Sequence, residues 1–345
     1  MRIRGIGRLR RLTQPFTNLF FKGTVVLAYH RVSDLLSDPQ LLSVTPRHFA
    51  EHVEIIRRQG YPTRLQDVSR ALNAGERPPG GVAVTFDDGY ADNLTNAKPA
   101  LERYDVPATV FVTTGYVDSQ RYFWWDELEQ LLLHHEPLPE QLCLHIGGTV
   151  HKWNLLKETN GAAYPSDHRW NVAETHDPSP RHALYRSLHR LLRPLPEAAR
   201  CKMLDELRAW TGIEITAADN TVLSTGQIVK LAEGGLIDVG SHSVTHPMFS
   251  TLSLPHQCTE IQNSKAALEE ILGSPVMSFA YPFGSKSDYT EDTAKTVQRA
   301  GYACACANFP EIVKSDSDPF QIPRFLVRDW DGDEFSRRLA AWLSA

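Results

Sequence analysis

The sequence predicts an α/β fold, a closed or nearly closed barrel of parallel strands wrapped in helices. Short apolar runs alternate along the chain with segments of helical periodicity, which is typical of parallel α/β proteins. The runs are continuously apolar, as strands buried on both faces are. With 345 residues, of which 42% are apolar and 22% charged, the composition excludes a disordered or collagen-like chain.

The candidate strands are short apolar runs separated by helical patterns. They are residues 24–29, 82–86, 108–113, 236–240, 276–281, 302–307 and 322–327. Between the first two runs, Thr45 and Pro46 are typical of a helix start, and we expect this helix to end at Gly60. Another helix is expected to end before Gly273.

The alternation is interrupted between about residues 119 and 223. Two segments in this stretch, residues 181–195 and 198–212, have the pattern of amphipathic helices. We therefore expect one barrel domain over residues 23–345, into which residues 119–223 are inserted as a helical cap.

Charge and cysteine content restrict the partners and the compartment. The 36 Lys and Arg against 41 Asp and Glu give a net charge of -5, so we expect no nucleic-acid partner. The five cysteines form no C-x-x-C pair, which favours a reducing compartment. No run of 18 apolar residues and no secretory signal pattern occur in the sequence. We expect a cytoplasmic protein.

A basic leader, residues 1–22, precedes the barrel. It contains five arginines and no acid, interleaved with apolar side chains. This composition suits peripheral association with the anionic inner face of the membrane. Docking of its apolar residues on the protein itself is the alternative.

Two adjacent carboxylates, Asp87 and Asp88, follow the second candidate strand in the sequence TFDDGY. Gly89 permits a tight turn that presents both side chains at the carboxyl edge of the sheet, where barrel active sites lie. One carboxylate can then bind a metal while its neighbour acts as general base. A solvated Asp-Asp-Gly turn is the alternative.

Two histidine pairs have a spacing that suits a divalent metal. His242 and His246 follow the fourth candidate strand in GSHSVTHP, whereas His48 and His52 enclose Glu51 in H-x-x-E-H, the pattern of inverted zinc peptidases. Position favours His242 and His246, because they lie at a strand end. For the other pair, a solvated helix face is the alternative.

Together, TFDDGY, GSHSVTHP and FAYPFG resemble the first three motifs of the NodB-homology polysaccharide deacetylases, in this order and at strand ends. The resemblance covers residues 24–118 and 223–330. It implies a distorted (β/α)7 barrel of NodB type that removes acetyl groups from N-acetylated amino sugars with a divalent metal, usually Zn²⁺. The seven candidate strands agree with this fold.

The resemblance also implies roles for the matching residues. Asp88, His242 and His246 would be the metal ligands, and Asp87 would be the general base. The backbone N–H of Tyr90 would face the developing oxyanion. Hydrolysis of an amide also needs an acid that protonates the departing amine.

The general acid and the residue that orients Asp87 match the motifs of the family less directly. Nothing after Trp330 matches the late histidine motif of many relatives. His30, at the end of the first candidate strand, resembles the permuted arrangement of exopolysaccharide deacetylases, and we expect it to be the general acid; a histidine capping the strand is the alternative. The arginine that often opens the third motif is absent. Arg324 is expected to orient Asp87, with a purely structural ion pair as the alternative.

The remaining expected contacts are with substrate. Tyr281, Pro282 and Phe283 of the third motif would form a groove wall. Trp330 follows Asp329 and resembles part of the fourth motif, so it would pack near the acetyl methyl; a core position is the alternative.

The sequence therefore predicts a metal-dependent hydrolase that deacetylates amino sugars of a polysaccharide or lipid-linked oligosaccharide. An amidase of small non-sugar amides and a non-catalytic glycan-binding barrel are the alternatives on the same fold. The intact Asp87, Asp88, His242 and His246 argue against the latter. The H-x-x-E-H peptidase is a further alternative.

Overall fold

A computed structural model describes residues 22–119, 121–134, 138–155, 169–215 and 222–345. Except for Lys22, the expected basic leader lies outside the described residues, so its membrane contact and the cytoplasmic location stay predictions. Within the described ranges, no helix has both the length and the apolar character needed to cross a membrane. All five cysteines are described, and all are free.

Seven parallel strands form one curved sheet, in the order β10-β9-β8-β5-β4-β1-β11. The strands are β1 (Thr24–Tyr29), β4 (Gly81–Phe86), β5 (Ala108–Val112), β8 (Ile237–Ser241), β9 (Ser278–Ala280), β10 (Cys304–Cys306) and β11 (Phe325–Leu326). Each overlaps one candidate strand of the sequence. Every residue of β1 and β4 is buried, which explains their continuously apolar character.

The two edges of this sheet are joined by the segment that leads into β11. Phe325 of β11 pairs with Leu27 of β1. Just before β11, Ile322 bridges to Cys306 of β10, and its N–H donates to the carbonyl of Ala305 at 2.8 Å. The sheet thus curls round into the distorted barrel that the sequence predicts.

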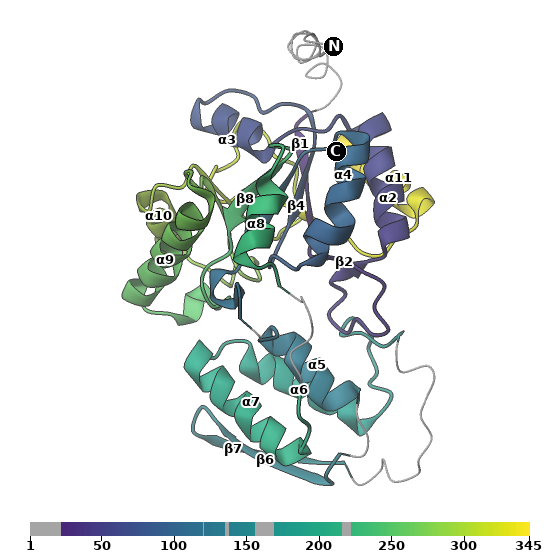
Figure 1. The fold of residues 1–345 in the computed structure, drawn as a ribbon, viewed down its shortest axis with the longest axis vertical. Coiled ribbons are helices and arrows are strands. Elements are labelled where there is room, and N and C mark those ends of the chain that lie inside the picture. The colour runs from purple at the N-terminus through teal and green to yellow at the C-terminus, as the bar shows by residue number, and fades with distance from the viewer. Residues whose placement is uncertain (1–21, 120, 135–137, 156–168, 216–221) are drawn as a thin grey trace.

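Helices surround the sheet (Figure 1). They are α2 (Pro46–Ile55), α3 (Leu65–Asn73), α4 (Lys98–Tyr104), α8 (Thr225–Ala232), α9 (Leu254–Leu272), α10 (Glu291–Arg299) and α11 (Gly332–Ser344). As the sequence predicts, Thr45 caps α2, and α9 ends before Gly273, which adopts a φ of 62°. The α2 segment continues to Gly60 as a π-helical turn rather than as α-helix.

The elements from α5 to α7, which lie between β5 and α8 in the chain, form a second lobe below the barrel in Figure 1. It comprises α5 (Trp124–Leu133), β6 (Gln141–Ile146), β7 (Thr149–Asn154), α6 (Pro180–Leu192) and α7 (Glu197–Thr211). Its apolar side chains form a separate core. Helices α6 and α7 coincide with the two amphipathic segments of the sequence, whereas the domain boundaries at 119 and 223 stay predictions.

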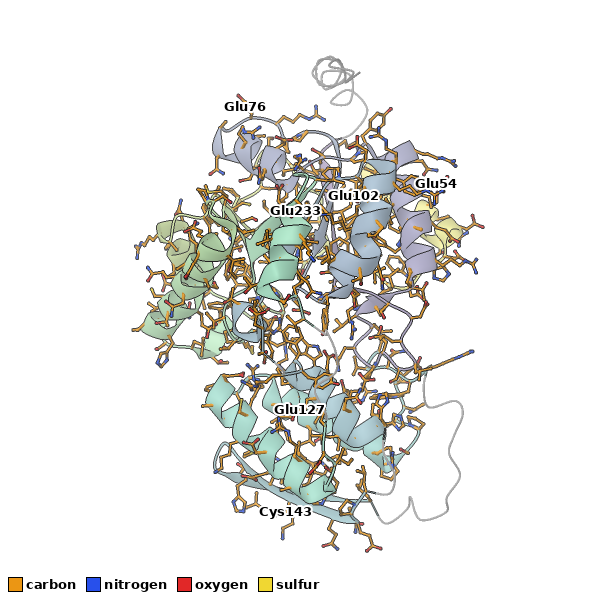
Figure 2. All side chains as sticks on the ribbon, in the orientation of Figure 1. Glu54, Glu76, Glu102, Glu127, Cys143 and Glu233 are labelled. Carbon is orange, nitrogen blue, oxygen red and sulfur yellow. The ribbon has the colours of Figure 1, made fainter. Side chains whose placement is uncertain are left out.

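The sequence analysis does not predict the antiparallel hairpin β6–β7. Gly147 and Gly148 form its turn with positive φ angles of 58° and 80°, the conformation that a tight two-residue hairpin turn requires. Cys143 lies on the exposed face of the hairpin, and Glu127 of α5 lies among the lobe helices, where it pairs with Arg208 of α7 at 2.6 Å (Figure 2). This lobe is therefore more than a layer of helices.

The buried histidine of the H-x-x-E-H segment holds the start of α11. Nε2 of His52 donates to the carbonyl of Trp330 at 2.7 Å, and the ring stacks on Phe335 at 4.0 Å. Because a carbonyl only accepts, Nε2 carries the proton, and Nδ1 is left to accept from the hydroxyl of Tyr29 at 3.3 Å. Both ring nitrogens of His52 are engaged, so neither is available to a metal.

The other two residues of the motif bind the same segment. His48 pairs with Asp329 at 2.7 Å, and the Glu51 carboxylate accepts from the N–H of Gly332 at 2.9 Å. Within the described ranges, these residues do not belong to any cluster that could hold a metal. The H-x-x-E-H pattern serves packing of α2 against α11, and the structure gives no support to the peptidase alternative.

Burial of His52 makes stability depend on pH. Burial lowers the pKa of His52 to about 4, whereas a free histidine titrates near 6.5. The unfolded chain therefore binds more protons between about pH 4 and 6.5, and the free energy of unfolding decreases as the pH falls through this window. We expect His52→Gln to remove up to about 1.4 kcal/mol per pH unit of that slope, measured by urea denaturation across the window.

The matched control is His145→Gln, at an exposed position of β6. This change should leave the slope at its wild-type value. An unchanged slope in His52→Gln would show that His52 titrates alike in the folded and unfolded chains.

Candidate active site

The carboxyl ends of neighbouring barrel strands bring the sequence-predicted residues to one cavity of about 260 Å³. Predicted site residues on its wall are His30 after β1, Asp87 and Asp88 after β4, His242 and His246 after β8, and Phe283 after β9. The other lining residues are Gln40, Leu42, Trp125, His189, Arg193, Asn308, Leu326 and Arg328.

Asp88, His242 and His246 form a buried cluster whose ligand atoms lie within 4.8 Å of one another. Oδ1 of Asp88 lies 3.5 Å from Nε2 of His242 and 3.4 Å from Nε2 of His246. Nδ1 of His242 donates to the carbonyl of Ala280 at 2.8 Å, so its Nε2 keeps a lone pair. Oδ1 of Asp88 is buried without a hydrogen-bond partner among the described residues.

The electrostatics of this cluster fit a divalent cation. Burial lowers the pKa of His242 and of His246, which keeps both imidazoles neutral as metal ligands must be. Burial and the charge of Asp87 raise the pKa of Asp88, so its carboxylate is costly without a cation beside it. Two neutral nitrogens and one carboxylate oxygen are ligands that Zn²⁺ accepts.

The loops that carry these side chains adopt backbone conformations that are unfavourable for most residues. Positive φ angles occur at Asp88 (72°), His246 (53°) and Phe283 (61°). Gly89 follows with a φ of 82°, and a Cβ there would lie 3.2 Å from Val112 of β5. The sharp turn after β4 therefore requires glycine at this position.

Asp87 forms a buried bidentate ion pair with Arg324. The two guanidinium nitrogens Nη1 and Nη2 donate to Oδ1 and Oδ2 of Asp87 at 2.7 Å each, and both residues are almost fully buried. Burial alone would raise the pKa of Asp87, but the Arg324 charge outweighs it and holds the pKa at about 2. Arg324 also donates to the hydroxyl of Thr85 and to the carbonyl of Ala307. Asp87 is thus ionised and fixed in orientation.

His30 lies on the cavity wall near Asp87. Burial lowers the pKa of His30 to about 4, while the charge of Asp87 raises it. The loop around His30 is fixed because its carbonyl accepts from the Asn93 side chain at 2.8 Å. The imidazole is therefore positioned to respond to charge that develops in the cavity.

The Tyr90 side chain lies outside the cavity, between the barrel and the lobe. Its hydroxyl donates to Asp126 at 3.0 Å and accepts from Nε1 of Trp125 at 2.9 Å. The Arg31 guanidinium lies 4.4 Å from the ring centroid. The ring thus anchors α5 to the strand end.

Three other predicted substrate contacts also lie outside the cavity. Tyr281 is buried in the core, where its hydroxyl donates to the carbonyl of Phe320 at 2.9 Å, and Pro282 is buried beside it. Trp330 packs against α11, with the guanidinium of Arg338 at 4.2 Å from its ring centroid. In the third motif, only Phe283 reaches the cavity, because the turn after β9 reverses the direction of its side chain.

The lobe supplies three cavity residues that the sequence did not identify. The Trp125 ring lies 4.8 Å from the His246 ring. His189 and Arg193 come from α6 and the residue that follows it. No motif signals His189 or Arg193, since both lie in the inserted segment and reach the cavity only through the fold.

Known proteins resemble two segments of this sequence. A family model described as polysaccharide deacetylase matches residues 74–136 and 211–305. Both matched segments contain site residues, namely Asp87 and Asp88 in the first and His242 and His246 in the second. His30 lies outside the match.

Individual relatives agree with the family model. The Bacillus subtilis (strain 168) protein YxkH is 29% identical over 111 residues, which are 32% of this chain and 38% of that protein. The poly-beta-1,6-N-acetyl-D-glucosamine N-deacetylase of Escherichia coli (strain K12) is 30% identical over 99 residues, 28% of this chain and 15% of that protein. The chain thus matches well under half the length of these two curated relatives.

The similarity to solved structures covers much more of the chain than the sequence matches do. The solved structure of IcaB from Ammonifex degensii has a TM-score of 0.57 at 18% identity, with 94% of this chain and 98% of that chain covered. This likeness concerns the fold alone.

The Asp87–Arg324 pair yields a test of the site. Arg324→Gln leaves a buried carboxylate without its partner, so we expect the free energy of unfolding of metal-free protein to fall by about 3–5 kcal/mol in urea denaturation. The double variant Asp87→Asn with Arg324→Gln should recover part of this loss, because it removes the uncompensated charge. A loss below about 1 kcal/mol in Arg324→Gln would mean that the pair behaves like an exposed one.

Proposed function

Because this chain belongs to the polysaccharide deacetylase family, we propose that it is a metal-dependent hydrolase that removes N-acetyl groups from amino sugars of a polysaccharide or lipid-linked oligosaccharide. The observation that carries this proposal is one cavity that contains a candidate Asp-His-His metal site, an ionised carboxylate and a further histidine. The named activity of the Escherichia coli relative supports a glycan that contains N-acetylglucosamine.

Asp88, His242 and His246 would hold the metal, and two imidazoles and one carboxylate with a cavity beside them suit Zn²⁺. When bound, the metal lowers the pKa of a water molecule and polarises the acetyl carbonyl. The nearby rings of Trp125 and Phe283, 4.8 and 4.7 Å from the His246 ring, limit the access of bulk water to this point.

Asp87 would act as the general base. Arg324 keeps it ionised, and each carboxylate oxygen retains a second lone pair beyond its bond to the guanidinium. The proton of the attacking water can pass to such a lone pair, while the fixed orientation removes the entropic cost of finding it. Arg324 itself is a positioning residue, because it lies behind Asp87 and not on the cavity wall.

His30 would protonate the departing amine, and the backbone N–H of Tyr90 would donate to the oxyanion. Negative charge favours the imidazolium form of His30, as the effect of Asp87 on its pKa illustrates. Negative charge that develops on the acetyl oxygen also favours the imidazolium form of His30. Proton uptake by His30 is therefore coupled to progress of the reaction.

Metal analysis tests the proposed site. After chelation and reloading with zinc, wild-type protein should hold one ion per chain, and His242→Ala and His246→Ala should lose it, because each removes a ligand. His48→Gln is the control, since His48 pairs with Asp329 away from the cluster, and it should retain the ion. Zinc retention in both alanine variants would refute this ligand set.

The zinc-loaded protein should release acetate from oligomers of N-acetylglucosamine. Binding of the oligomers without acetate release would favour the glycan-binding barrel. Release from small non-sugar amides alone would favour the amidase.

The two proton-transfer residues are tested by kinetics. Asp87→Asn and His30→Gln should each lower kcat by about 10²–10⁴-fold, because each removes a positioned acid or base. Zinc content should stay at the wild-type value in both, which separates lost proton transfer from lost metal. A His30→Gln variant with wild-type kcat would show that another group protonates the amine.

A further inference from the structure

Two arginines, Arg193 and Arg328, line the cavity, and they differ in whether a carboxylate pairs with the guanidinium. Arg193 pairs with Asp288 at 2.6 Å, and the Asp288 carboxylate is fully buried. Among the described residues, Arg328 forms no ion pair with a carboxylate within 4.0 Å, and its guanidinium contacts the carbonyl of Leu41. The positive charge of Arg328 is therefore the one that faces the cavity without a direct counter-ion.

The protein holds the Arg328 side chain in place without neutralising it. Nη1 donates to the carbonyl of Leu41, a residue with a positive φ of 57°. Burial lowers the pKa of Arg328 and the charge of Asp38 raises it, but the Asp38 carboxylate already accepts from the N–H groups of Leu42 and Ser43 at 2.9 and 2.8 Å. Arg328 is only partly exposed. A half-buried guanidinium without an anion is costly, so its position is best explained by an anion that arrives with a ligand.

Arg328 lies on the His30 side of the cavity. Strand β11 pairs with β1 so that Leu326 lies beside Ala28, and Arg328 and His30 each follow two residues later at these neighbouring strand ends, where both line the cavity. If His30 protonates the departing amine, this side faces the sugar ring and not the acetyl methyl. The ring atoms within reach are then those next to the carbon that bears the amine.

We propose that Arg328 binds an acidic substituent of the substrate, a phosphate or a carboxylate, on a ring carbon adjacent to the amine-bearing carbon. The planar guanidinium fork matches the oxygens of both groups. This inference rests on the proposed function and narrows its substrate from any N-acetylated amino sugar to an acidic one.

Binding to metal-free protein gives the most direct test, because a metal would itself attract phosphate. Titration calorimetry would compare N-acetylglucosamine with its 1-phosphate, its 3-O-carboxyalkyl ether and its 6-phosphate. We expect the 1-phosphate or the 3-O-carboxyalkyl ether to bind about 10-fold tighter than the neutral sugar, or better, since hydrogen bonds to charged groups are strong. The 6-phosphate should gain little, and whichever of the other two gains identifies the acidic group.

Arg328→Gln should abolish the advantage of the acidic sugar, and Arg328→Lys should keep part of it. Arg70→Gln is the matched control, because Arg70 is an exposed arginine of α3 that pairs with Asp67 at 2.8 Å. Equal affinity for neutral and acidic sugars, or an acidic preference that survives in Arg328→Gln, would overturn the proposal.

Acetate release by the zinc-loaded enzyme distinguishes this inference from the function on which it rests. The acidic substrate should have the lower KM in wild type, and Arg328→Gln should raise that KM with little change in kcat, because the contact is the same in the ground and transition states. Release from neutral and acidic sugars with equal KM would refute the role of Arg328 and leave the deacetylase intact. Arg328-dependent binding without any acetate release would refute the deacetylase and leave the acidic subsite.

Discussion

The buried ion pair between Asp87 and Arg324 connects barrel closure with the chemistry at the barrel rim. Asp87 follows β4, and Arg324 directly precedes β11, so the two residues lie on either side of β1 in the sheet. The bidentate contact therefore joins the last strand to the strand that carries the paired carboxylates. A shift of β11 relative to β4 would separate the charges inside the protein, at a high cost in free energy. The same interaction fixes the register of the sheet edge and the orientation of the Asp87 carboxylate.

This pair also explains how two adjacent aspartates acquire different properties. Asp87 faces a guanidinium that holds its pKa at about 2, whereas Asp88 faces two neutral imidazoles, and burial raises its pKa. Neighbouring carboxylates in similar surroundings would compete for one proton. Here the positive φ at Asp88 turns the chain, so consecutive side chains enter different environments. Asp87 is therefore a permanent anion, whereas Asp88 is an anion only where a cation compensates its charge.

Much of the fold could be predicted because it depends on local sequence properties. Most of the seven sheet strands are short apolar runs, although β8 contains Asp238, and the motif residues follow these runs directly. The hairpin β6–β7 carried a usable signal, the Gly147-Gly148 turn between strands of alternating burial. Its short length and polar neighbours concealed it among the helical segments. The contributions of Arg193 and Arg328 to the cavity depend on long-range packing, which no local pattern encodes.

The predicted site residues that do not line the cavity show the limit of motif-based inference. A motif fixes the position of the backbone at a strand end, but the direction of each side chain depends on the turn that follows. Phe283 has a positive φ and reaches the cavity, while Tyr281, two residues earlier, is still part of the strand edge and stacks on Tyr289 at 4.1 Å in the core. Trp330 resembles part of a motif, yet its ring packs against α11, with the Trp342 ring at 6.1 Å and the Arg338 guanidinium at 4.2 Å.

The cavity joins two kinds of surface with different structural origins. Its floor consists of side chains at the ends of β1, β4 and β8, which the barrel holds rigidly because each strand is hydrogen-bonded on both sides. Its outer wall comes from loops and from the inserted lobe, through Trp125, His189 and Arg193. Arg193 binds Asp288 of the barrel at 2.6 Å and lies 4.4 Å from the Phe283 ring, so the lobe is fastened at the cavity itself. Substitutions in the lobe can therefore change which ligand fits the cavity while the side chains on the floor stay in place.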